Sequence, residues 1–156
     1  ISKLAHDRRP EVIHQTGAKN IDEAKQCYAQ AGVEADIKAF IDDMSAAYSW
    51  ADLVICRSGA MTVFELAAAG VASVLVPYPF AVDDHQTANA RYLEQAGAAI
   101  VRQQDELSED WVAETIEAFS SDRKRLVEMA VAARQLAIPD SACLIADTCM
   151  RSGGLA

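Results

Sequence analysis

The chain has 156 residues, of which 51% are hydrophobic and 24% charged, and its formal net charge is −9. This length and balance suit one globular domain, and the sequence has no run of about 18 apolar residues that would predict a membrane span. A strongly acidic chain repels nucleic-acid backbones and anionic lipids, so we expect neither to bind this domain. The 4 cysteines lack C-x-x-C spacing, which argues against structural zinc and predicts free thiols in a reducing cytosol.

Strands and helices are expected to alternate along most of the chain. The expected strands lie at residues 11–17, 36–40, 53–56, 73–76 and 98–101. The expected helices between them lie at residues 20–32, 44–50, 61–69 and 84–95. Residues 53–56 are a continuous apolar run, and residues 73–76 are expected to be another buried strand; such strands are typical of a parallel sheet covered on both faces. The sequence therefore predicts an α/β fold, a Rossmann-like parallel sheet flanked by helices, forming one domain over residues 1–156.

The end of the chain is expected to be helical. Apolar residues recur at helical spacing from Trp111 to Phe119 and from Leu126 to Ala137. Pro139 can open a final helix at its first turn, whereas the tail Ser152-Gly153-Gly154 is expected to be disordered.

Three polar or glycine-bearing loops follow the predicted strands, at residues 40–44, 57–61 and 77–86. In a doubly wound sheet, ligands bind beyond the carboxyl ends of the strands, so these loops form the expected site. The first loop contains Asp42 and Asp43, which suit a helix cap better than a metal site.

The stretch from Arg57 to Thr62 joins a predicted strand to a predicted helix. The helix N-terminus presents unpaired N–H groups, and Gly59 lets a phosphate approach the backbone. Spacing alone supports a pyrophosphate site and a plain strand–helix turn about equally. Arg57 is either a phosphate partner or a surface charge. One glycine does not make a dinucleotide fingerprint or a P-loop.

Glu65 lies one turn after Thr62 and has two interpretations. Its carboxylate can accept two hydrogen bonds from a ribose diol. Alternatively, Thr62 and Glu65 match the S/T-x-x-E capping box, which the local pattern slightly favours, although Ser58 or Gly59 is the more natural helix boundary.

Asp83, Asp84, His85 and Gln86 precede a predicted helix that contains Asn89. His85 and Gln86 can present a ring nitrogen and an amide to sugar hydroxyls. The alternatives are an aspartate N-cap with solvated neighbours, and a metal site, which three consecutive ligands make unfavourable. Cys56, in an apolar strand, is expected to be a core residue, with a catalytic cysteine as the lesser alternative.

Together, these motifs resemble the C-terminal domain of the MurG family of GT-B glycosyltransferases, in glycosyltransferase family 28. The resemblance rests on residues 40–44, on 51–62 (ADLVICRSGAMT), on 65–70 and on 83–90, which include Asp-Asp-His-Gln. It runs from about Val12 to the final helix. The family transfers N-acetylglucosamine from UDP-N-acetylglucosamine to lipid I, which makes lipid II of peptidoglycan.

The resemblance implies roles for particular residues. The backbone of Ile41 corresponds to the group that reads the uracil edge, and Glu65 to the carboxylate that holds the ribose. Met61 and Thr62 correspond to positions near the nucleotide and its phosphates, in a loop shaped by Ser58 and Gly59. The remaining expected contacts, to the N-acetylglucosamine hydroxyls, are those of His85, Gln86 and Asn89. No metal or other cofactor is implied.

Parts of the family pattern are not found in this sequence. Nothing before Val12 resembles the family's Gly-Gly-Ser loop, and the acceptor domain, which carries the lipid I site, the membrane contact and the general base, is absent. We therefore expect a truncated, soluble donor domain without turnover, from a protein peripheral to the cytoplasmic face of the bacterial inner membrane.

Other functions remain open at this stage. The chain can belong to another UDP-sugar enzyme, such as a glycolipid synthase or UDP-N-acetylglucosamine 2-epimerase. It can also be a nucleotide-sugar-binding subunit completed by a separate membrane partner, or a Rossmann-like domain without a ligand.

Overall fold

The computed structural model describes residues 1–153. The strands are β1 (Ile13–Gln15), β2 (Asp36–Lys38), β3 (Leu53–Cys56), β4 (Ala72–Leu75) and β5 (Ala99–Val101). The α-helices are α1 (Ile21–Gln30), α2 (Met44–Trp50), α3 (Ala60–Ala69), α4 (His85–Gln95), α5 (Glu109–Ser121), α6 (Arg123–Gln135) and α7 (Ser141–Ser152). Short 3-10 turns are η1 (His6–Arg8), η2 (Val82–Asp84) and η3 (Gln104–Glu106). The predicted alternation of strands and helices is confirmed, with boundaries that differ by two residues or fewer.

All the strands pair in parallel, as the apolar runs predict. They form two hydrogen-bonded sheets, β1-β2 and β3-β4-β5, and not one continuous sheet. In the larger sheet Cys56 is the register partner of Leu75, so β3 and β4 end side by side. The loops that follow these two strands therefore start at the same edge of the sheet.

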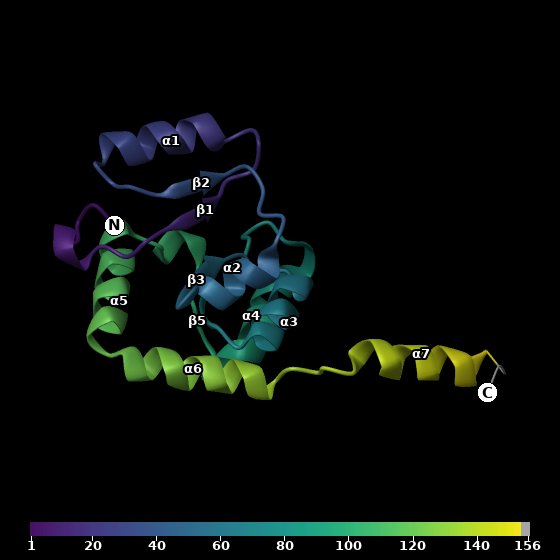
Figure 1. The fold of residues 1–156 in the computed structure, drawn as a ribbon. Helices are drawn as coiled ribbons and strands as arrows, with labels where there is room; N and C mark the ends of the chain where they lie inside the picture. Colours follow the sequence, from purple (N-terminus) through teal and green to yellow (C-terminus); the bar gives the residue numbers. More distant parts are fainter. Residues whose placement is uncertain (154–156) are drawn as a thin grey trace.

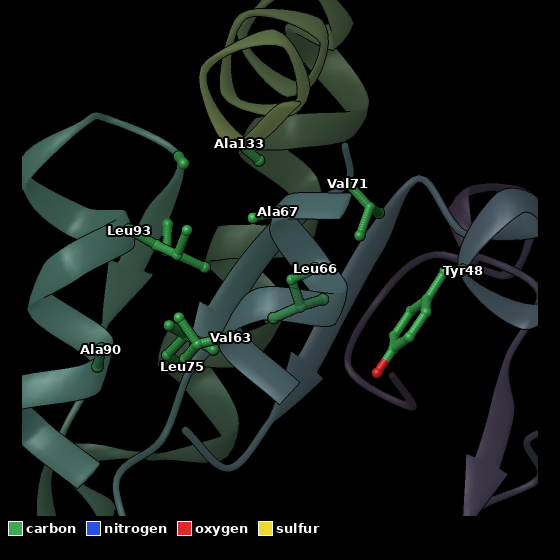
Figure 2. Packing of buried hydrophobic residues seen from close by; sticks show 11 residues of the cluster. Tyr48, Val63, Leu66, Ala67, Val71, Leu75, Ala90, Leu93 and Ala133 are labelled. Atoms are coloured by element: carbon green, nitrogen blue, oxygen red, sulfur yellow. The ribbon is translucent and has the colours of Figure 1, made fainter. Parts of the chain in front are cut away.

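The core lies around β4, whose four residues are all buried. Leu75 packs in a cluster with residues of α3 and α4, including Leu66 and Leu93, and these three side chains are 0% exposed (Figure 2). Ala72, on the opposite face of β4, packs with Phe119 of α5 and with residues of α6. The three-stranded sheet thus has helices on both faces, which is the predicted Rossmann-like layering.

Helix α3 ends against α6 at Gly70. Gly70 is left-handed, with φ 70°, and a Cβ built on it would lie 3.1 Å from the Cβ of Arg134. The guanidinium of Arg134 also donates to the carbonyl of Ala68. Glycine therefore meets two demands here, the backbone conformation that ends the helix and a close approach to α6.

Helix α7 lies apart from the other elements, beyond an extended stretch that follows α6 (Figure 1). Its Leu144 and Ile145 are 57% and 64% exposed. Ser152, expected in a disordered tail, is the last residue of α7, and Gly154 lies outside the described residues. Within the described part of the chain, no helix is long and apolar enough to cross a membrane.

Candidate functional site

Two of the three predicted site loops meet at the carboxyl edge of the β3-β4-β5 sheet, whereas the loop at residues 40–44 follows β2 of the smaller sheet. The loop after β3 leads into α3, and the loop after β4 leads through η2 into α4. Because β3 and β4 are parallel neighbours, the starts of α3 and α4 come together above their ends. The structure thus brings together the residues from Arg57 to Thr62 and from Gln86 to Asn89.

Ser58 is the centre of this meeting point and is 0% exposed. Its hydroxyl donates to the backbone carbonyl of Gln86 at 2.8 Å, and its own carbonyl accepts from the Asn89 side-chain amide at 3.1 Å. The two bonds fix the start of α4 against the start of α3. Ser58 therefore shapes the loop, in line with what the resemblance implied, and the side chain of Asn89, expected to contact the sugar, bonds the Ser58 carbonyl from the other side.

The N-terminus of α3 is open in the way that an anion site requires. Gly59 is its N-cap, and no side chain in the described part of the chain caps this helix end. Gly59 has φ −61°, which any residue can adopt, and a Cβ built on it would lie 3.7 Å from the Oγ1 of Thr62. The glycine is therefore not required by the fold, which is consistent with a ligand that approaches the backbone here.

Arg57 lies at the border of this site and hydrogen-bonds to the loops around it. Its guanidinium donates to the carbonyls of Val76 and Pro77 at 3.3 and 3.0 Å and to the Gln104 side chain at 2.6 Å. It also lies 5.5 Å from the ring centroid of Tyr78. Arg57 therefore holds the loops after β3, β4 and β5 together, a role that neither of the two sequence interpretations contained.

Glu65 lies inside α3, one turn beyond the helix start, and its side chain is exposed. Because the N-cap is Gly59 and not Thr62, the capping box that the local pattern favoured is wrong. The Oε2 atom of Glu65 instead accepts a hydrogen bond from the Tyr48 hydroxyl at 3.0 Å. The carboxylate is thus fixed in place and remains accessible to a ligand.

Ile41, the expected uracil reader, is tied to the end of β1. Its backbone N–H donates to the side-chain oxygen of Gln15 at 2.8 Å. Two residues later Asp43 caps α2 by accepting from the N–H of Ala46 at 2.8 Å, as predicted for this aspartate pair. Sequence reasoning missed Gln15; its position near the carboxyl end of a predicted strand, next to the expected site, is the signal that could have found it.

His85 and Gln86 begin α4, after two aspartates with unusual backbone angles. Asp83 and Asp84 have φ 52° and 51°, a left-handed conformation that aspartate tolerates better than most residues. Asp84 occupies the N-cap position, as one of the alternatives held, but its side chain makes no cap hydrogen bond within the described residues. His85 is exposed, and the side-chain oxygen of Gln86 accepts from the Tyr78 N–H at 3.0 Å.

The thiol of Cys56 is unsuited to nucleophilic chemistry. It packs against the main core cluster, as expected. Burial, and then the negative charge of Glu65, raise its pKa to about 12. A thiol with this pKa carries almost no thiolate at neutral pH, so the alternative of a catalytic cysteine is wrong.

Two hollows, of about 300 and 400 Å³, lie beside the edge strand β5, away from these loops. Both include Ile100 and Arg125, and their walls come mainly from α5 and α6. None of the candidate site residues lines either hollow. The chemistry of the loops, and not the volume of these hollows, therefore locates the site.

Parallel βαβ units with polar loops gathered at one edge of the sheet define a Rossmann-like α/β domain. The chain belongs to the family described as the glycosyltransferase family 28 C-terminal domain, which matches residues 1–145.

Relatives and solved structures agree with this placement. Two relatives, from Marinobacter nauticus and Cupriavidus metallidurans, are 51% and 53% identical over 92% and 99% of this chain. Both are named UDP-N-acetylglucosamine--N-acetylmuramyl-(pentapeptide) pyrophosphoryl-undecaprenol N-acetylglucosamine transferase. This chain spans only 40% and 43% of their lengths.

The crystal structure of Acinetobacter baumannii MurG superposes with a TM-score of 0.87 at 41% identity, covering 97% of this chain and 45% of that one. Glycosyltransferase VinC, solved with dTDP, has a TM-score of 0.61 over 80% of this chain and 28% of its own. At 17% identity, VinC shows only a shared fold. The resemblance to the MurG family is confirmed.

Proposed function

We propose that this chain is the donor domain of an N-acetylglucosaminyltransferase that converts lipid I to lipid II in peptidoglycan synthesis. It would bind UDP-N-acetylglucosamine as the sugar donor. The observation that carries the proposal is the identity of about 50%, over more than nine tenths of the chain, to relatives named for this reaction. The loops at the carboxyl edge of the sheet supply a site of suitable chemistry.

The nucleotide would lie across the starts of α2 and α3. The backbone of Ile41 would read the uracil edge, and the exposed carboxylate of Glu65 would accept hydrogen bonds from the ribose hydroxyls. The pyrophosphate would meet the uncapped N-terminus of α3, close to Gly59, Met61 and Thr62. Met61 is 76% exposed and thus accessible to a ligand. Arg57 would add a fixed positive charge beside this helix end.

The sugar would face the start of α4. His85 and Gln86 are the first two residues of this helix and would bond the N-acetylglucosamine hydroxyls. The oxygen of the Gln86 side chain is held by the Tyr78 N–H, which leaves its amide group to act as a donor. Ser58 and Asn89, which join α3 to α4, would keep these contacts in register with the phosphate site.

The reaction itself would be an inverting displacement at the anomeric carbon of the donor sugar. The N–H groups and dipole of α3 would stabilise the negative charge that develops on the UDP leaving group. The acceptor site, the general base and the peripheral contact with the cytoplasmic face of the bacterial inner membrane would come from the rest of the protein. We therefore expect donor binding, but no turnover, from this chain alone.

Calorimetric titration of UDP-N-acetylglucosamine, with UDP-glucose and ADP as comparison ligands, tests this proposal. We expect selective binding of uridine nucleotides, a preference for the acetamido sugar and weaker binding by Glu65→Ala. If the 156-residue chain shows no measurable binding, the titration is repeated on a protein extended to the length of its relatives. Equal binding of ADP and UDP-N-acetylglucosamine, or no measurable binding of UDP-N-acetylglucosamine by the extended protein, would contradict the proposal.

A further inference from the structure

Tyr48 is the buried residue of α2, with 9% of its surface exposed. It belongs to the main core cluster and lies at one side of it, at the edge of the labelled side chains (Figure 2). A buried phenol needs a partner for its hydroxyl, since an unpaired one is costly. That partner is Glu65 of α3, whose Oε2 accepts the hydrogen bond at 3.0 Å.

We propose that Tyr48 is a positioning residue, which holds the Glu65 carboxylate in the orientation that binds the ribose of a uridine nucleotide. This inference rests on the proposed function, because it assigns to Tyr48 a share in the ribose contact of the same site. Tyr48 acts through Glu65 and is not itself proposed to touch the nucleotide.

The arrangement of the two side chains supports a positioning role. A glutamate on an exposed helix face has several rotamers, and a ligand that needs one of them must bear the cost of ordering it. The Tyr48 hydroxyl engages one carboxylate oxygen and selects one orientation before a ligand arrives. Each carboxylate oxygen can accept more than one hydrogen bond, so the contact with Tyr48 leaves acceptor capacity for a diol.

The environment keeps this contact in one protonation state. Burial, and then the hydrogen bond to Glu65, raise the pKa of the Tyr48 phenol above its ordinary value, so the phenol stays a donor. The nearby Cys56 thiol also has a raised pKa and stays neutral, so it places no negative charge beside Glu65. The Tyr48 phenol is therefore a neutral donor to Glu65 over the physiological range.

Helix α2 also links the ribose contact to the base contact. Ile41 lies in the loop that leads into α2, and Asp43 caps that helix. Tyr48 then joins the same helix to Glu65. One short helix thus sets the position of the proposed uracil reader relative to the proposed ribose ligand.

The test compares two nucleotides that differ only in the diol, UDP and 2′,3′-dideoxyuridine diphosphate. The Kd of each is measured by calorimetry for the unaltered protein, Tyr48→Phe, Glu65→Ala and the control Tyr92→Phe. The Tyr92 hydroxyl lies 3.5 Å from the carbonyl of Leu136, outside the site, so the control removes a phenol without touching Glu65.

We expect the unaltered protein and Tyr92→Phe to prefer UDP by the same ratio. Glu65→Ala should abolish the preference, and Tyr48→Phe should reduce it about three- to tenfold, which is within the range of one typical intramolecular hydrogen bond. The ratio of the two Kd values matters because a general loss of stability would weaken the binding of both nucleotides alike. Unfolding temperatures are recorded alongside to confirm that each variant is folded.

An unchanged ratio in Tyr48→Phe would overturn the positioning role and leave the proposed function intact, since Tyr48 would then only pack α2 against α3. Failure of the protein extended to the length of its relatives to bind UDP would instead overturn the proposed function, and this inference with it. Binding of UDP without any preference over the dideoxy nucleotide would remove the ribose role from Glu65 and from Tyr48 together.

Discussion

The side-chain oxygen of Gln15 accepts the backbone N–H of Ile41 at 2.8 Å, which ties the end of β1 to the loop before α2. This bond connects the smaller sheet to the segment proposed to read the base. The site therefore depends on the β1-β2 sheet as well as on the larger one.

Replacing Gln15 with alanine should weaken the binding of uridine nucleotides. The loss of one hydrogen bond of about 1 kcal/mol would release the loop of Ile41 and raise the Kd of UDP about fivefold. Calorimetry measures the Kd, with Gln26→Ala on the exposed side of α1 as the matched control. A Kd that is the same in both variants would show that Gln15 does not order this loop.

Replacing Gly59 with alanine should separate binding from stability. The backbone of Gly59 suits alanine, and the added Cβ would make an ordinary 3.7 Å contact with Thr62 Oγ1. Alanine caps a helix less well than glycine but restricts the unfolded chain more, so the two effects should offset within about 1 kcal/mol. The same Cβ would stand where a phosphate approaches the helix end.

We therefore expect an unfolding free energy near that of the unaltered protein, measured in urea, together with a Kd for UDP at least about tenfold higher. An unchanged Kd would show that the pyrophosphate does not bind at the N-terminus of α3. A large loss of stability would show that Gly59 serves the fold.

The thiol of Cys56 should be the last to react with a thiol reagent. With a pKa of about 12, its thiolate fraction at pH 8 is about 1 in 10,000. Cys27, Cys143 and Cys149 are exposed and should be modified first in a time course with a disulfide reagent. Glu65→Gln removes the second cause of the raised pKa and should speed the Cys56 reaction, whereas equal rates for all four thiols would contradict the assignment.

The same pKa has a consequence for stability. A thiol that binds its proton more tightly when folded makes the folded state less favourable as the pH rises above the unfolded pKa of about 9. Stability should therefore fall between about pH 9 and pH 12, and Cys56→Ala should flatten this decline. Urea unfolding at several alkaline pH values measures the slope for both proteins.

Most of the fold and the place of the site follow from the sequence because their signals are local. A parallel strand such as residues 53–56 is an unbroken apolar run, and glycine or proline follows such strands closely, although Ile55 is 43% exposed and β3 is less buried than its sequence predicts. The contacts within the site are not local. Tyr48 and Glu65, like Gln15 and Ile41, meet only after helices and strands pack, so neither pair leaves a spacing pattern.

Glu65 shows how one boundary decides an interpretation. The same four letters, Thr62 to Glu65, are a capping box if the helix starts at Thr62 and an exposed face if it starts after Gly59. The helix start depends on Ser58, whose burial against α4 is a tertiary feature. The pairing of the strands into two sheets, and the left-handed backbone of Asp83, are tertiary in the same sense.

Replacing Gly70 with alanine should destabilise the fold more than the same change at Gly97. Both glycines follow helices with φ near 70°, at 70° and 74°, so both changes carry the cost of a left-handed alanine, about 1 kcal/mol. At Gly97 nothing lies within 4 Å of the added Cβ among the described residues, whereas at Gly70 the Cβ would meet Arg134 Cβ at 3.1 Å. Urea unfolding of both variants isolates the close approach of α3 to α6, which should add about 1–3 kcal/mol at Gly70. Equal losses would mean that α6 shifts to admit the methyl group.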